Sequence, residues 1–269
     1  MRILITNDDG INAKGLGALE HIAQALSDDV WVVAPEVEQS GASRALTLTR
    51  PLRVRRLSER RFAVEGTPTD CVLLAVQHLI KDGRPDLVLS GVNRGQNLAE
   101  DVTLSGTVAG AIEGMALGIP AIALSQEIEA LHDEERAPYE TAQVHAPGLI
   151  TRLLGGGWPA GVILNINFPA VAPGAVTGVE VTRQGFRDRV GRHVEKRTDL
   201  RGRDYYWMGF NQHRSDPASG TDLSAIYEHR ISVTPLHIDL THGPSIAALQ
   251  TLLAAPGPDN NAALKGAWR

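Results

Sequence analysis

Short apolar runs alternate with helical patterns along about the first 170 residues of the chain. Runs of strand length lie at 2–6, 86–90, 121–124 and 162–166, and the stretches between them, such as 13–26, repeat apolar residues at helical spacing. Strands separated by helices form parallel sheets, because each helix carries the chain back to the edge where the next strand starts. The pattern therefore predicts an α/β fold with a mostly parallel sheet that helices cover on both faces.

The pattern changes near two prolines, Pro169 and Pro173. The segments that follow have an extended character, so we expect a C-terminal antiparallel β arm. An isolated hairpin has little core of its own to bury, which favours an arm that joins copies of the chain in a homodimer or homotetramer. We expect three parts: a core domain at 1–175, a β-hairpin appendage or oligomerisation arm with strands returning to the core at 176–241, and a C-terminal helix with a loose tail at 242–269.

Charge and cysteine content restrict the partners and the compartment. The net charge of -5 and the pI of about 6.0 give no basic excess, so no stable nucleic-acid binding is expected. The single cysteine, Cys71, can form no intramolecular disulfide, which is typical of a reducing compartment. No apolar run approaches the roughly 20 residues that span a bilayer, and polar Asn7 follows the first run without a signal-peptide pattern. We therefore expect a cytoplasmic protein that does not bind membranes.

Polar side chains follow three of the predicted strands at the points where those strands end. Asp8 and Asp9 come directly after the first strand. Ser40 lies in the loop after a second strand, predicted at 30–34, and Asn93 follows the strand at 86–90. Ligands of doubly wound sheets bind at the carboxyl ends of the strands, so we expect these side chains to meet at one edge of the sheet.

Two adjacent carboxylates repel each other unless a positive charge neutralises them. A set of oxygen ligands selects a hard cation such as Mg²⁺ or Mn²⁺. The sequence therefore favours a divalent cation beside Asp8 and Asp9, with Ser40 and Asn93 at matching strand ends. The competing interpretation is structural, since either aspartate could instead cap the helix that begins near Ala13.

A second candidate element is Ser105-Gly106-Thr107, at the start of an Ala-rich helix. The first N–H groups of a helix have no partner within the helix, and with the helix dipole they attract phosphate. Ser105 is explained equally well as a residue that only caps the helix. Asn97, in the loop before Ser105, carries no meaning by itself, because asparagine is common in loops.

Several short motifs occur in a fixed order along the chain: Asn7-Asp8-Asp9-Gly10, Ser40-Gly41-Ala42-Ser43, Gly66-Thr67-Pro68-Thr69-Asp70-Cys71, Ser90-Gly91-Val92-Asn93 and Ser105-Gly106-Thr107-Val108. In this order they resemble the signature of the SurE family, the survival protein E nucleotidases. Further likeness at 164–169, 181–183 and 234–237 extends the resemblance to about residue 240. Each motif is weak alone, and their order makes the resemblance specific.

The resemblance implies a Rossmann-like α/β fold with a protruding β arm. It implies hydrolysis of nucleoside 5′- and 3′-monophosphates, and in some members of short polyphosphate, with one Mg²⁺ or Mn²⁺ per subunit. Eight positions would carry the function. The implied metal ligands are Asp8, Asp9, Ser40 and Asn93, of which Asp8 and Asp9 are also the catalytic candidates, and the implied substrate-side residues are Asn97, Ser105, Gly106 and Thr107.

Two other functions are compatible with these residues. One is a phosphatase that forms an aspartyl-phosphate, as haloacid-dehalogenase-like enzymes do, although their Asp-x-Asp pattern is absent because Asp8 and Asp9 are adjacent. The other is a non-catalytic sensor that binds a nucleotide without turnover. An assay of phosphate release distinguishes the sensor from an enzyme.

Overall fold

The computed structural model describes residues 1–128, 139–188, 192–210 and 215–254. The chain divides into two units, Met1–His237 and Ile238–Arg269. The described part of the second unit contains one helix, α6 (Gly243–Ala254). All other helices and strands of the described residues belong to the first unit, which carries the candidate site.

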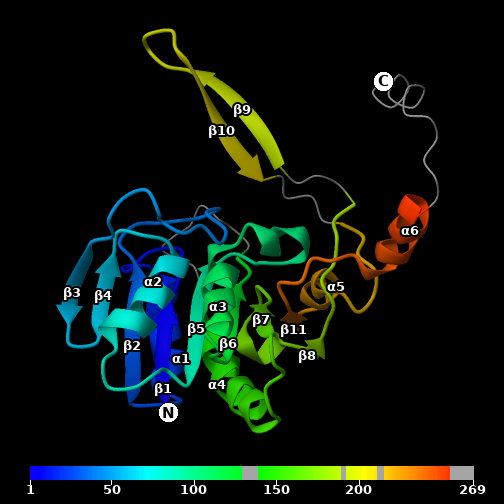
Figure 1. Cartoon of the computed structure of the whole chain (residues 1–269). Helices are drawn as coiled ribbons and strands as arrows, with labels where there is room; N and C mark the ends of the chain where they lie inside the picture. The colour runs from blue at the N-terminus through cyan, green and yellow to red at the C-terminus, as the bar shows by residue number, and fades with distance from the viewer. Residues whose placement is uncertain (129–138, 189–191, 211–214, 255–269) are drawn as a thin grey trace. The chain divides into compact units, whose positions relative to one another are not determined.

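Nine strands form one sheet in the first unit (Figure 1). They are β1 (Arg2–Thr6), β2 (Asp29–Pro35), β3 (Val54–Ser58), β4 (Arg61–Val64), β5 (Leu87–Arg94), β6 (Ala121–Gln126), β7 (Ile163–Phe168), β8 (Gly178–Val181) and β11 (Arg230–Leu236). Their order is β3-β4-β2-β1-β5-β6-β7-β11-β8. The central pairs are parallel, whereas β3 runs antiparallel to β4 and β11 antiparallel to β7. The predicted α/β fold with a mostly parallel sheet is confirmed.

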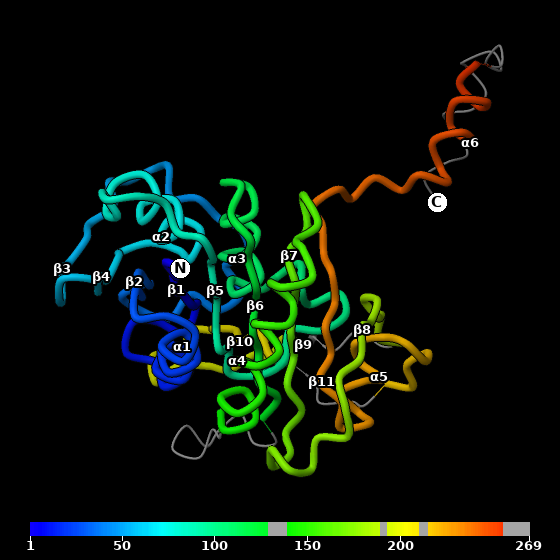
Figure 2. The backbone as a smooth tube through the Cα atoms, turned by 90° about the horizontal axis from the view of Figure 1, so that it is seen from below, coloured from blue at the N-terminus to red at the C-terminus, as the bar shows by residue number. Residues whose placement is uncertain are grey.

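Helices cover both faces of the sheet, as predicted. They are α1 (Lys14–Gln24), α2 (Pro68–Leu74), α3 (Gly106–Ala116) and α4 (Glu140–Gly155), with short turns at η1 (Ala75–Leu79), η2 (Ala99–Thr103) and η4 (Pro173–Ala175). Figure 2 shows α2 and α3 on one side of the strands and α1 and α4 on the other. The core accordingly has two layers of buried apolar side chains, one on each face of the sheet.

The start of α2 illustrates how local sequence fixes an element. The Thr67 hydroxyl accepts a hydrogen bond from the Asp70 N–H at 3.2 Å, and the Asp70 carboxylate accepts one from the Thr67 N–H at 2.9 Å. These two bonds satisfy N–H groups that have no partner within the first turn of the helix. Pro68 has no N–H, so it leaves no unpaired donor at its position. Cys71, in the same helix, is buried, and its thiol is free.

The segment after β8 contains an element that the sequence pattern does not predict. α5 (Asp222–Tyr227) is a short helix that the chain forms just before β11. Its N-cap is Thr221, and Leu223 and Ile226, three residues apart, are buried on one side. A helix of six residues is too short for a periodic pattern to distinguish it from an extended segment.

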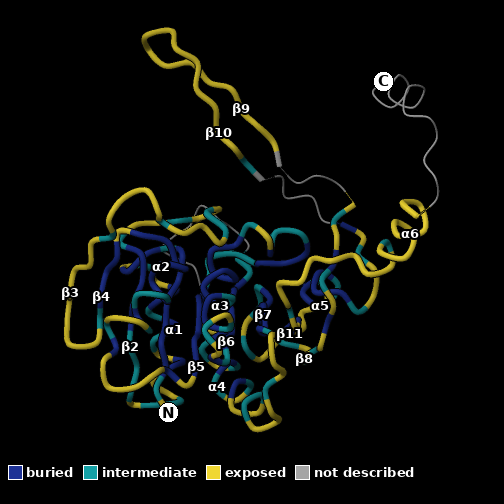
Figure 3. The backbone as a smooth tube through the Cα atoms, viewed as in Figure 1, coloured by how far each residue is buried: buried dark blue, intermediate teal, exposed yellow. Residues whose placement is uncertain are grey.

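The predicted antiparallel hairpin is present. β9 (Arg192–Thr198) and β10 (Asp204–Phe210) pair with each other and form a two-stranded sheet separate from the large one. Figure 3 shows both strands as exposed over most of their length, in contrast to the buried strands in the middle of the large sheet. Among the helices of the described residues, none has the length and apolar character needed to cross a membrane.

Candidate active site

Asp8 meets the first turn of α3. Asp8 follows β1 and is only 4% exposed. The Thr107 hydroxyl donates to Asp8 Oδ1 at 2.5 Å. A Cβ on Gly106 would lie 2.8 Å from Asp8 Cβ and 2.9 Å from Asp8 Oδ2, which is closer than real Cβ contacts. The glycine therefore allows the helix to begin in direct contact with the carboxylate.

Asp9 lies beside the end of β5. The Arg94 N–H donates to Asp9 Oδ2 at 3.2 Å, so the residues after β1 and the end of β5 lie side by side at the carboxyl edge of the sheet. Asn93 precedes Arg94, and its side-chain nitrogen donates to the Gly95 carbonyl at 2.8 Å. This hydrogen bond orients the amide and leaves its oxygen as the atom that could bind a cation.

Ser40 lies in a loop that contacts Asp8 through the backbone. The Gln39 N–H donates to the Asp8 carbonyl at 2.7 Å. The Ser40 hydroxyl donates to Glu38 Oε1 at 2.8 Å and is exposed. The loop is thus held beside the aspartates, with the Ser40 hydroxyl turned toward Glu38. The hydroxyl donates its hydrogen to Glu38, and the lone pairs of its oxygen stay free to bind a cation.

Burial raises the pKa of both aspartates. Burial is the main cause for Asp8, and hydrogen bonds from the Thr107 hydroxyl and from the N–H groups of Thr107 and Gly106 act in the opposite direction. Burial and then the charge of Asp8 raise the pKa of Asp9 to about 7. A cation beside the pair would favour the ionised form of both carboxyl groups. The two acids therefore suit a site that a positive charge completes.

The donor set is compatible with a hard cation. In the described ranges no three His, Cys, Asp or Glu side chains gather in a group that could hold a metal ion. A cation at Asp8 and Asp9 would therefore need neutral oxygens as well, and the side chains of Ser40 and Asn93 are the candidates that the sequence motifs indicate. Carboxylate, hydroxyl and amide oxygens are the ligand types that Mg²⁺ and Mn²⁺ prefer.

Ser105 is the N-cap of α3. Its hydroxyl accepts a hydrogen bond from the Val108 N–H at 3.0 Å, so Ser105 caps the helix, and a further role on the substrate side stays a prediction. The anion at this helix end is the Asp8 carboxylate, which the N–H groups of Gly106 and Thr107 approach. The helix end thus binds negative charge, as expected from its dipole, and binding of phosphate there stays a prediction.

Asn97 is held by strands β6 and β7. It is 8% exposed, and its side-chain nitrogen donates to Ser125 Oγ at 2.9 Å. Its N–H donates to Asn167 Oδ1 at 2.9 Å, and its carbonyl accepts from Asn165 Nδ2 at 2.9 Å. Sequence reasoning assigned no role to Asn165 or Asn167. Their place at alternate positions of an otherwise apolar strand could have indicated a role, because buried amides need hydrogen-bond partners.

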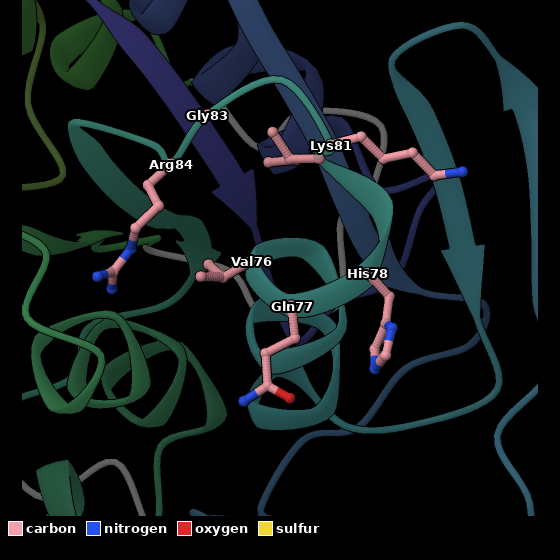
Figure 4. A pocket seen from close by; sticks show the side chains of 7 residues that line it. Val76, Gln77, His78, Lys81, Gly83 and Arg84 are labelled. Carbon is pink, nitrogen blue, oxygen red and sulfur yellow. The ribbon is translucent and has the colours of Figure 1, made fainter.

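A surface pocket lies at the edge of the sheet opposite to the one that carries Asp8 and Asp9. Its lining residues come from η1 and the loop before β5: Val76, Gln77, His78, Ile80, Lys81, Gly83 and Arg84 (Figure 4). The Arg2 side chain, at the start of β1, donates to the Gly83 carbonyl, so the pocket adjoins the amino end of that strand. Lys81 and Arg84 point away from each other in Figure 4. The pocket is therefore separate from the aspartates and has no convergent set of polar groups.

Comparison with known proteins identifies the family. The model of the family described as survival protein SurE matches residues 3–190. The chain belongs to the SurE family. A relative from Caulobacter vibrioides, named 5′-nucleotidase SurE, is 71% identical over 96% of this chain and 98% of its own length. A relative of the same name from Phenylobacterium zucineum is 66% identical over 96% of this chain and 99% of its own.

The crystal structure of the SurE protein from Aquifex aeolicus has a TM-score of 0.80 to this chain, at 37% sequence identity. The similarity covers 94% of this chain and 100% of the Aquifex chain. The Aquifex protein therefore has the same fold as this chain. The resemblance that the ordered motifs indicated is confirmed by both comparisons.

Proposed function

We propose that this SurE-family hydrolase removes phosphate from nucleoside 5′-monophosphates, and from 3′-monophosphates and short polyphosphate as further substrates. The name 5′-nucleotidase of relatives up to 71% identical supports the nucleotide substrate. The observation that carries the proposal is the contact between Asp8 and the first turn of α3. A cation bound by the carboxylate would attract the phosphate group from one side. The N–H groups of the helix end would attract the same phosphate group from the other side.

The proposed site holds one Mg²⁺ or Mn²⁺ with Asp8, Asp9, Ser40 and Asn93. When bound, the cation stabilises negative charge on the phosphoryl oxygens. The N–H groups of Gly106 and Thr107 donate to the phosphate from the helix end. Asp9 is more accessible than Asp8 and accepts a proton from the attacking water at a carboxylate oxygen. Asn97 and Ser105 border the substrate side of the site.

A panel of nucleotides tests this proposal. Nucleoside 5′- and 3′-monophosphates and a short polyphosphate are each assayed for phosphate release with Mg²⁺, Mn²⁺, Zn²⁺ or excess EDTA. We expect release with Mg²⁺ or Mn²⁺, none in EDTA, and recovery when the metal is added back. Full activity in excess EDTA contradicts the metal site. Nucleotide binding without release indicates a sensor, and a trapped phospho-enzyme indicates an aspartyl nucleophile.

We also propose that β9 and β10 join copies of the chain into a homodimer or homotetramer. In this proposal residues 1–175 carry the chemistry and the arm within 176–241 carries assembly. Large apolar side chains are exposed on the hairpin, which buries few of them against its own strands. The most exposed are Val194 (62%), Tyr206 (60%), Trp207 (58%) and Met208 (84%).

The triple variant has serine in place of Tyr206, Trp207 and Met208. It should shift toward monomers in sedimentation velocity, because these side chains supply the proposed interface. The matched control is Val144→Ser, which removes a side chain of similar exposure (62%) from α4. The control should leave the sedimentation coefficient unchanged. A monomeric wild-type protein at micromolar concentration, or an unchanged oligomer in the triple variant, contradicts the proposal.

A further inference from the structure

Asp222 is a buried carboxylate that the proposed chemistry does not use. It lies at the first turn of α5 and is 0% exposed. Its Oδ2 accepts a hydrogen bond from the Ala99 N–H at 2.8 Å, and its Oδ1 accepts one from the Gly185 N–H at 2.8 Å. One side chain thus joins three segments that lie far apart in sequence. They are the 95–104 loop before α3, the 183–187 segment and α5.

The geometry around Asp222 leaves little freedom to move. Ala99 has a φ of 54°, a left-handed conformation that alanine rarely adopts without an external constraint. A Cβ on Gly185 would lie 2.8 Å from Asp222 Oδ1, so only glycine permits this approach. The side chains of Leu98 and Leu223 pack together in a small buried cluster beside these hydrogen bonds. The carboxylate and the cluster hold the 95–104 loop in one position.

Arg187 forms a second connection between two of these segments, the 183–187 segment and the 95–104 loop. Its guanidinium Nη1 lies 2.7 Å from Asp101 Oδ2 and 3.2 Å from Glu100 Oε1. Its own N–H also donates to Glu100 Oε2 at 3.2 Å. The Arg187 side chain is only 14% exposed, so water screens these ion pairs less than it screens pairs on an open surface.

The 95–104 loop leads directly into the candidate site. Ser105 follows it as the cap of α3, and the next two residues contact Asp8. The Leu104 carbonyl accepts a hydrogen bond from the Ser43 N–H at 3.2 Å, and the Thr103 carbonyl accepts one from the Ser43 hydroxyl at 2.7 Å. The position of the loop therefore affects both the helix end at Asp8 and the loop that contains Ser40.

We infer that Asp222 and Arg187 are positioning residues, which fix the 95–104 loop so that the first turn of α3 lies within hydrogen-bonding distance of Asp8. Within the described residues, the hydrogen bonds and ion pairs of both side chains join this loop, the 185–187 segment and α5, and none of them reaches Asp8 or Asp9. The expected loss of kcat rests on the proposed function. The expected loosening of the first turn of α3 rests on the structure alone.

The variant Asp222→Asn keeps the shape of the side chain but replaces one acceptor oxygen with a donor. We expect kcat to fall by roughly 10- to 100-fold, since misplacement of about 1 Å can cost on the order of 10²-fold. The inhibition constant of inorganic phosphate should rise, and the Kd for Mn²⁺ should rise as well, because the displaced turn of α3 contacts Asp8. Hydrogen exchange of the amides at 96–108 should become faster, independently of any activity.

Arg187→Met repeats the test if Asp222→Asn does not fold, and Arg187→Lys should recover part of kcat because it keeps the charge. The matched control is Arg230→Met, which removes an exposed arginine paired with Glu180 and Glu228. It should change neither kcat nor exchange. If Asp222→Asn and Arg187→Met lower only Tm, with kcat and exchange at 96–108 unchanged, the inference is overturned. If wild type releases no phosphate from any nucleotide, the proposed function fails, and the exchange result still decides the inference.

Discussion

The variants Asp8→Asn and Asp9→Asn should each lose about 10²- to 10³-fold in kcat/KM while keeping their fold. A bound cation supplies several kcal/mol of charge stabilisation in the transition state, and about 1.4 kcal/mol corresponds to a tenfold rate change. An amide in place of a carboxylate has nearly the same shape but lacks the charge that holds the cation. The loss should therefore accompany a weaker Kd for Mn²⁺, measured by calorimetry, with Tm of the metal-free protein changed by only a few degrees.

The matched control for these variants is Asp28→Asn. Asp28 is exposed and precedes β2, at the opposite edge of the sheet from Asp8. This change removes a carboxylate of the same type without affecting the candidate site, so kcat/KM and the Kd for Mn²⁺ should equal those of wild type. Wild-type turnover by Asp8→Asn or by Asp9→Asn would remove the substituted aspartate from the mechanism.

The sequence was sufficient to predict the elements that meet at the carboxyl edge. Alternating strands and helices fixed the parallel sheet, and in such a sheet the residues after adjacent strands must lie together. The hydrogen bond from the Arg94 N–H to Asp9 shows this proximity directly. The start of α3 at Ser105 followed from capping chemistry, because a serine before a helical pattern supplies an acceptor for the unpaired N–H groups.

Contacts between distant segments could not be predicted in the same way. Asp222 accepts from Ala99, 123 residues away in sequence, and Asn165 and Asn167 bind Asn97 from 68 and 70 residues away. No local pattern identifies such partners, since each side chain alone is compatible with a loop or a strand. The orientation of Ser40 was equally hidden, because it depends on the competing acceptor Glu38 rather than on the position of the loop.

The variant Gly106→Val should reduce kcat by on the order of 10²- to 10³-fold, the usual effect of losing a preorganised donor at a developing negative charge. A Cβ at this position would lie 2.9 Å from Asp8 Oδ2, so the helix end and the carboxylate must move apart. Because the clash involves Asp8 itself, the Kd for Mn²⁺ should also rise. The variant Thr107→Val removes only the hydroxyl donor to Asp8 and should be milder, with a loss of about tenfold.

Two further variants separate a role in turnover from a role in stability. Ser105→Ala removes the cap of α3 and should lower stability by about 1 kcal/mol while leaving kcat near wild type. Gly148→Val adds the same side chain to α4, where a Cβ would meet nothing within 4 Å, and should leave kcat and the Kd for Mn²⁺ unchanged. If Gly106→Val behaves like Gly148→Val, the first turn of α3 serves only to start the helix. A loss of turnover in Gly106→Val without a loss in Gly148→Val shows that the site needs the contact between the helix end and Asp8, because only Gly106 brings backbone donors against Asp8.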